Sequence, residues 1–366
     1  MAFDTTDVIL SLIKIVVVLL ALLNVTPIMV WVERRGSALI QDRPGPNRVG
    51  PLGLFQSIAD ALKFILKEDI IPAGAHKWIY TLAPAFGLLP ALTTIAVVPW
   101  GRPFLLEERE MFGRVLFAGG RWFEPVIANV NVGILIVFAL ASLGVYGIVA
   151  AGWASNNKFS MFGAIRASAQ MISYELSLAL SAISVLLAAG SLRLTDVVWQ
   201  QTGYFRLFDA IPVPAWNVFS PGMWLAFVVF VVSAFAETNR LPFDFAEAEA
   251  ELVAGYHTEY SSMKFALFFM AEYMAMATMA ALIVTLFLGG WDIPYYDEPA
   301  TFLGFLLSVV AFVVKVACIL FVFVWVRWTI PRLKYDILMR LGWKVFLPLA
   351  FINILIVAVF IALRWL

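Results

Sequence analysis

Six acidic residues are crowded into one short segment of an otherwise apolar chain. They are Glu237, Asp244, Glu247, Glu249, Glu251 and Glu259, and Arg240 is the one strong base among them. On an α-helix, Glu247 and Glu251 would share a face while Glu249 would point away. Neighbouring carboxylates repel one another and can share protons in coupled titrations. The spacing therefore indicates either a proton-exchanging cluster or an acidic surface loop that keeps the protein soluble.

Three further ionisable residues lie near the middle of long apolar stretches, namely Glu175, Glu272 and Lys315. At the rise of an α-helix they are about 13–21 Å from the ends of these stretches. A charge at that depth in a bilayer costs at least about 2.5–3.5 kcal/mol, so such residues normally face the bundle interior or a water-filled cavity. For the two Glu residues this environment suits a proton relay better than a static strut. For Lys315, the alternative is a carboxylate partner that only fixes helix packing.

The composition defines the elements that must position these groups. The chain is 62% hydrophobic and 14% charged, and its mean hydropathy is +0.90. A soluble domain this apolar would expose large sticky patches, so the composition predicts a polytopic membrane protein. The length alone allows two domains, but a helical bundle in one bilayer absorbs all 366 residues, and we expect one membrane domain over 1–366. The zero net charge points to no nucleic-acid partner.

Eight apolar stretches are long enough to cross a hydrocarbon core of about 30 Å. They cover residues 8–31, 78–100, 126–152, 166–190, 222–241, 262–289, 301–327 and 344–364. We therefore expect an all-α fold with eight transmembrane helices, of which 222–241 is the shortest. No internal repeat is evident, which disfavours an inverted-repeat transporter.

The basic residues orient this bundle. Sixteen of the 25 Lys and Arg residues fall in the connections after the odd-numbered spans, and seven fall on the opposite side. The positive-inside rule therefore predicts both termini on the periplasmic side of a bacterial cytoplasmic membrane. It also places two loops in the cytoplasm, the first over residues 32–77 and the acidic one over 237–261.

The first cytoplasmic loop combines charge, a punctuated backbone and an amphipathic helix. Glu33, Arg34 and Arg35 end the first span, and "RPGPNRVGPLG" follows, whose Pro and Gly residues stiffen and turn the backbone. "LFQSIADALKFIL" then predicts an amphipathic interfacial helix, with Leu54, Ile58, Leu62 and Ile65 on its apolar face. A lipid-surface anchor explains this helix by itself. Beside the arginines it can also wall a channel for an amphipathic ligand.

Metal ligands are scarce in the sequence. It has one Cys and two His residues, whereas iron–sulfur clusters, haem and zinc need sets of Cys or His ligands. We therefore expect no metal redox centre in this chain. Cys318 stands alone in an apolar run, which predicts a small buried apolar residue.

Four segments carry a family resemblance that extends over nearly the whole chain. They are "VERRGSALIQDRPGPNRVGPLGLFQSIADALKFILKED", "MISYELSLAL", "AETNRLPFDFAEAEAELVAGYHTEYSSMKFALFFMAEY" and "WTIPRLKYDILMRLGWK". Together they resemble the H-subunit family of bacterial NADH:quinone oxidoreductase (respiratory complex I), the counterpart of the mitochondrially encoded subunit 1. Residues 102–125 and 191–221 are the least family-like.

The resemblance implies a subunit at the junction of the redox arm and the membrane arm. Such a subunit forms much of the quinone access tunnel and the start of a carboxylate path for protons or charge coupling. The resemblance and the neighbouring charges together assign to the tunnel Glu33, Arg34, Arg35, Arg43, Asp60 and Arg332. They assign to the path Glu175, Glu237, Asp244, Glu247, Glu249, Glu251, Glu259 and Glu272. Lys334 stands where the family more often has Arg, so a bidentate contact there is not expected.

The resemblance also implies what the chain needs from outside. The substrate is a quinone, either ubiquinone or menaquinone, and NADH, FMN and iron–sulfur clusters are held by partner subunits. The expected partners are peripheral-arm quinone-site subunits, small membrane-arm subunits and lipids. The chain is then a non-redox subunit of a translocase, with no catalytic residue that acts in this chain alone.

Three other interpretations compete with this one. A homologous membrane subunit of a hydrogenase-type complex would share the fold and the buried acids but need no quinone. A free-standing proton-coupled transporter also fits acids at mid-membrane depth, and broken helices or a repeat would support it. A passive anchor for a redox arm is disfavoured by the free energy needed to keep Glu175 and Glu272 in a membrane.

Overall fold

Long apolar helices dominate the protein. The computed structural model describes residues 5–106, 109–111, 114–117, 121–207, 211–245, 252–296 and 299–363. Within these ranges, seven helical units are long and apolar enough to cross a membrane. They are α1 (Thr5–Ile40), α3 (Lys77–Thr94), α4 (Gly133–Ala154), α5 (Lys158–Ala189), α9 (Ser262–Phe287), α10 (Phe302–Thr329) and α11–α12. The last unit consists of α11 (Tyr335–Arg340), a π-helical turn (Leu341–Phe346) and α12 (Leu347–Ala362). The predicted helical membrane architecture is confirmed at this level.

One further apolar helix, α7 (Met223–Glu237), is shorter than the others. It has 15 residues, and at the rise of an α-helix it extends for about 22 Å, less than a typical hydrocarbon core. It corresponds to the stretch predicted at 222–241. The remaining helices are α2 (Gln56–Leu66), α6 (Leu194–Gln200) and 3₁₀ turns at Pro51–Gly53, Ile95–Val97, Asn217–Phe219 and Gly255–His257.

Three small antiparallel strand pairs depart from the all-helical prediction. β1 (Phe104–Leu106) pairs with β4 (Arg121–Phe123), β2 (Arg109–Met111) with β3 (Arg114–Phe117), and β5 (Tyr204–Leu207) with β6 (Ile211–Pro214). All lie in connections between the long helices, and aromatic and β-branched residues recur in them, which favours extended backbone. A search for long apolar stretches does not detect such short pairs.

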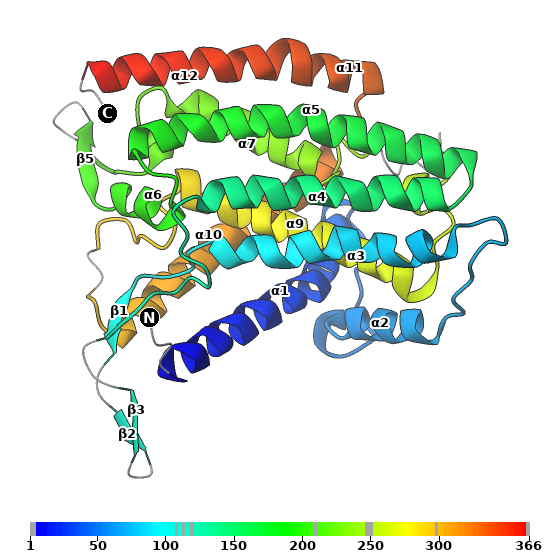
Figure 1. Ribbon diagram of the computed structural model, residues 1–366, viewed down its shortest axis with the longest axis horizontal. Coiled ribbons are helices and arrows are strands. Elements are labelled where there is room, and N and C mark those ends of the chain that lie inside the picture. Colours follow the sequence, from blue (N-terminus) through cyan, green and yellow to red (C-terminus); the bar gives the residue numbers. More distant parts are fainter. Residues whose placement is uncertain are drawn as a thin grey trace.

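The helices form one bundle with a distinct polarity. α3, α4, α5 and α12 lie side by side, and α1 and α10 cross them at an angle (Figure 1). The start of α1, the end of α12 and the strand pairs lie toward one end of the bundle. α2 lies near the opposite end (Figure 1).

α9 lies at the centre of the bundle. It is the most buried of the seven long units, and it contacts α1, α3, α7 and α10. Its second half is almost entirely buried, and Leu282, Ile283 and Val284 are fully inaccessible. α1, in contrast, exposes large apolar side chains such as Leu12 and Leu20, as expected for a helix that faces lipid or a partner. Groups carried on α9 are therefore held by the interior of the protein.

Two details differ from the sequence predictions. α1 does not end near residue 31 but continues to Ile40, so Glu33, Arg34 and Arg35 are helical. Hydropathy marks where a helix leaves the hydrocarbon, whereas no proline interrupts the backbone before Pro44 once Pro27 is passed. Cys318 was predicted to be buried, but it is exposed on the outer surface of α10. An apolar surface in a membrane bundle can face lipid, so apolar neighbours do not imply burial.

Candidate functional site

Glu33 is a buried carboxylate on α1 whose partners come from elsewhere in the fold. It forms an ion pair with Arg327 of α10, and its Oε2 lies 3.7 Å from Nη1 of Arg240. Tyr273 of α9 donates its hydroxyl hydrogen bond to the same Oε2. The guanidinium of Arg240 lies over the Tyr273 ring, 4.1 Å from its centroid. These contacts join α1, α9, α10 and the turn after α7 through one buried negative charge.

A cavity of about 240 Å³ opens beside this cluster, and we call it the Glu33 cavity. Its lining residues are Val30, Glu33, Arg34, Ser37, Arg43, Phe269, Tyr273, Arg327 and Trp328. A neighbouring cavity of about 380 Å³ shares Arg43 and is also lined by Arg35, Pro44 and Gly45. Apolar walls with a few convergent charges suit a ligand with a polar head and an apolar body.

α2 is attached to α1 next to the Glu33 cavity. Asp60 Oδ2 lies 2.5 Å from Nη1 of Arg34, and Gln56 donates to the other Asp60 oxygen at 3.2 Å. Ser57 Oγ donates to the backbone oxygen of Pro27 at 2.8 Å. The structure thus brings Asp60 into contact with an arginine of the cavity wall.

Arg332, which was assigned to the same tunnel, lies elsewhere. Its Nη2 is 3.3 Å from Oδ2 of the buried Asp244, a residue assigned to the carboxylate path. These two assignments therefore meet in one ion pair, and Arg332 does not line the Glu33 cavity.

A second cavity lies on another side of α9, and we call it the Glu237 cavity. Its volume is about 90 Å³, which is room for several water molecules, and Glu237, Tyr256 and Glu272 contribute to its lining. Glu237 is 6% exposed, and its Oε2 has no hydrogen-bond partner among the described residues. Tyr256 donates to Glu272 Oε1 at 3.0 Å. A buried carboxyl group without a donor is unfavourable in a dry site, so these groups favour a hydrated cavity.

Other acids of the predicted path surround this cavity or lie outside the described residues. Glu175 of α5 accepts a hydrogen bond from Ser142 of α4 and is close enough to Glu237 for the two charges to interact. Glu259 Oε1 accepts from Asn157 at 2.5 Å, in front of α5. Glu247, Glu249 and Glu251 lie outside the described residues.

The two cavities share α9 as a common wall. Glu272 faces the Glu237 cavity, and Tyr273, the next residue, lines the Glu33 cavity and binds Glu33. Consecutive helical residues point about 100° apart, so a single turn of α9 presents one group to each cavity. A change of charge in one cavity therefore has a short physical route to the other.

Comparisons with known proteins agree with this arrangement. The profile of the NADH dehydrogenase family matches residues 13–358. A NADH-quinone oxidoreductase H subunit of Koribacter versatilis, the second of its kind by name, is 46% identical over 355 residues, or 97% of each chain. The chain belongs to the H-subunit family of NADH-quinone oxidoreductase. An H subunit of Geobacter metallireducens is 45% identical over 98% of each chain, and that of Salinibacter ruber is 46% identical over 94% of this chain and 93% of its own. The resemblance carried by the sequence motifs is thereby confirmed.

Several residues of this H-subunit family member were not singled out in the sequence. Arg327 was counted only for orientation, Arg240 was noted only as the base among acids, and Tyr273 was not noted at all. The contact between Glu33 and Tyr273 joins residues that are 240 positions apart, so no local spacing reveals it. The one available signal was that Tyr273 directly follows the mid-span Glu272.

Lys315 holds the end of α9. Its ammonium donates to the backbone oxygens of Leu288 at 2.7 Å, Gly290 at 3.2 Å and Asp292 at 2.6 Å. It also lies over the ring of Trp216, 4.1 Å from the centroid. Free carbonyls at a helix C-terminus attract a cation, so Lys315 stabilises the point where α9 ends.

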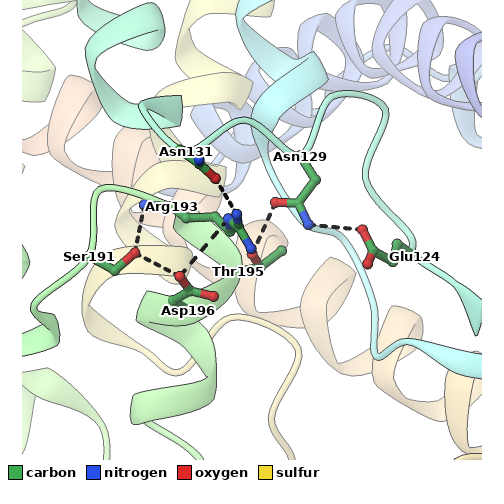
Figure 2. Close-up of polar contacts among 7 residues, drawn as sticks. All are labelled: Glu124, Asn129, Asn131, Ser191, Arg193, Thr195 and Asp196. Carbon is green, nitrogen blue, oxygen red and sulfur yellow. Dashed lines mark hydrogen bonds and ion pairs between the residues drawn. The ribbon is translucent and has the colours of Figure 1, made fainter. Parts of the chain in front are cut away.

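A separate polar network lies at the end of the bundle that carries the strand pairs. Figure 2 shows Asn129 between Glu124 and Thr195, and Arg193 between Asn131 and Asp196. Ser191 donates to Asp196 at 2.7 Å. The network connects the segment before α4 with the start of α6, and none of its residues lines the Glu33 or Glu237 cavity.

Close packing at Gly163 positions Tyr256 and gives a testable prediction. A Cβ at Gly163 would lie 2.7 Å from Gly255 Cα and 2.7 Å from Tyr256 N. Gly163→Ala should therefore force the Tyr256 turn away from α5 and destabilise the fold by about 1–3 kcal/mol. The midpoint of thermal unfolding of the purified complex measures this loss. Gly144→Ala is the matched control, because no atom lies within 4 Å of its added Cβ, and an equal shift in both variants would contradict the packing argument.

Proposed function

We propose that this chain is the eight-span membrane-arm H subunit of a proton-translocating NADH:quinone oxidoreductase in a bacterial cytoplasmic membrane. α7 supplies the eighth crossing, and its limited length fits a helix surrounded by protein rather than lipid. The start of α1 and the end of α12 lie toward one end of the bundle, as an even number of crossings requires (Figure 1). The excess of Lys and Arg in the opposite loops makes this end periplasmic.

In this function, the Glu33 cavity and its neighbour receive the quinone. Arg34, Arg43 and Arg327 offer positive charge to the head-group oxygens, and apolar walls suit the tail. Ile58, Leu62 and Ile65 of α2 are exposed, which fits a helix that lies in the lipid interface beside the tunnel. The chain does not transfer electrons itself. FMN and iron–sulfur clusters in partner subunits pass two electrons from NADH to the quinone.

The carboxyl groups then couple this reduction to proton movement. A reduced, negatively charged head group raises the pKa of nearby acids in the cytoplasmic loop and draws protons to them. The altered charge is felt by Glu237, Glu272 and Glu175 around the Glu237 cavity. The observation that carries this proposal is the shared wall, in which Glu272 and Tyr273 face different cavities.

The related proteins favour this proposal over a hydrogenase-type complex, because their names specify NADH-quinone oxidoreductase. An assay of the purified assembly decides between the two. NADH oxidation that needs quinone and is blocked by quinone-site inhibitors supports the proposal. Proton transport in vesicles that contain only this chain would instead favour a free-standing transporter.

The acidic loop provides a direct test of the coupling path. The double variant Glu247→Gln/Glu249→Gln removes two charges and leaves side-chain volume nearly unchanged. We expect the complex to assemble and proton pumping per NADH oxidised to fall, because fewer loop acids can take up protons when quinone is reduced. Pumping is measured as NADH-driven acidification of reconstituted vesicles. Wild-type pumping in this variant would contradict the role of the loop.

A further inference from the structure

α2 is held at its C-terminal end by a second set of contacts, which come from α9. Ser262 Oγ donates to the backbone oxygen of Phe64 at 2.9 Å, and the rings of Phe64 and Phe265 lie 5.8 Å apart. Ser261 Oγ donates to Glu68 O at 3.3 Å and accepts from the Ile70 N–H at 3.2 Å. The segment that follows α2 is therefore bound to the first turns of α9.

An ion pair completes this attachment. Lys264 Nζ lies 2.9 Å from Asp69 Oδ2, and the Lys264 side chain is 12% exposed whereas that of Asp69 is 47% exposed. Lys264 also lies over the ring of Tyr80, 5.2 Å from its centroid. A fully exposed pair would contribute little to stability, but a mostly buried ammonium without a counter-charge is unfavourable. Asp69 is thus a specific partner for Lys264.

The α9 side of this attachment is fixed by the interior. Tyr260, 6% exposed, stacks on Tyr80 with ring centroids 4.2 Å apart and planes at 6°. Tyr260 donates to Tyr80 O at 3.1 Å, and Tyr80 donates to Glu259 O at 2.7 Å. Burial, and then the neighbouring Tyr80, raises the pKa of Tyr260 well above its ordinary value, so its hydroxyl remains a donor. α9 therefore provides the rigid side, and α2 is the element whose position is set.

We infer that Lys264 and Asp69 are positioning residues that hold α2 and its Asp60 against the Glu33 cavity and so control quinone access. This inference rests on the proposed function, because it assumes that quinone enters beside α2. Neither residue lines the Glu33 cavity. Asp60 and Ser57 attach the first half of α2 to α1, whereas Lys264, Ser261 and Ser262 attach its end to α9. Loss of the second attachment leaves α2 held at one end only.

The test uses Asp69→Asn in the purified whole complex, because Asp69 is the more exposed partner and its replacement is the milder change for folding. Asp69→Glu is the conservative variant that retains the charge. We expect Asp69→Asn to raise the KM for a short-chain quinone about fivefold with kcat changed less than about twofold. Amide hydrogen exchange over residues 56–70 should become faster. Asp69→Glu should restore most of both properties.

A matched control separates a local effect from a general loss of stability. Asp196→Asn removes the partner of Arg193 at the other end of the bundle and should change neither property (Figure 2). Unchanged exchange over 56–70 in Asp69→Asn would overturn the inference and leave the proposed function intact. Faster exchange with an unchanged KM would overturn it differently, by showing that quinone does not pass α2.

Discussion

Glu33→Gln should lower quinone-dependent NADH oxidation by at least about tenfold, because it removes the charge that Arg240 and Arg327 share. The Arg240 side chain is 6% exposed, and loss of one member of a buried ion pair destabilises a protein by about 3–5 kcal/mol. The uncompensated guanidinium groups should then move toward the Glu33 cavity. Inhibitor-sensitive NADH:quinone turnover of the purified complex, normalised to subunit content, measures the effect.

A second variant at the same cluster shows whether the charge or the packing matters. Tyr273→Phe removes one hydrogen bond to Glu33 but leaves both arginine contacts in place. Its activity should fall less than that of Glu33→Gln. NADH oxidation by a hydrophilic artificial acceptor should be unchanged in both variants, because it does not require quinone. Full quinone turnover in Glu33→Gln would contradict a role for this cluster.

Glu237→Gln should reduce proton pumping by about 10–100-fold, because the amide keeps the shape of the side chain but cannot carry a proton. Glu237 is buried, one of its oxygens has no hydrogen-bond partner among the described residues, and the side chain lines a cavity that has room for water. The KM for quinone should stay the same, since Glu237 does not line the Glu33 cavity. NADH-driven acidification of vesicles and steady-state kinetics measure the two properties.

The acidic variant at the same position provides the control. Glu237→Asp keeps a titratable group but shortens it by one methylene, so pumping should be partly retained. If Glu237→Gln pumped as well as Glu237→Asp, proton transfer by this carboxyl group would be ruled out. A raised quinone KM in both variants would indicate that the two cavities are not separate.

The apolar architecture was predictable from the sequence because the hydrophobic effect acts on long stretches. The seven long helical units fall where apolar residues accumulate, and the α7 stretch was correctly noted as the shortest. Helix ends were less predictable, as α1 shows, because a helix continues past the hydrocarbon until its backbone is interrupted. The small strand pairs were missed, because their few residues carry little pattern.

The candidate site was predictable as a set of residue types but not as a set of contacts. Glu175 and Glu272 stand out because a mid-membrane charge is unfavourable, and Glu33, Arg34 and Arg35 stand out as a dense cluster. That Tyr273 and Arg327 bind Glu33 follows only from the packing of α1, α9 and α10. The sequence likewise placed Arg332 with the tunnel, whereas its contact is Asp244. Partners distant in the chain are set by helix packing, which single positions do not encode.

The capping of α9 limits how this helix can respond during turnover. Lys315 grips the carbonyl groups beyond one end, and Lys264 with its neighbouring serines secures the other. A rod clamped at both tips resists sliding along its axis but still permits slight bowing or twisting at mid-length. Glu272 and Tyr273 lie nearer its middle than its tips, where a small rotation would turn one side chain toward its cavity as the other turns away.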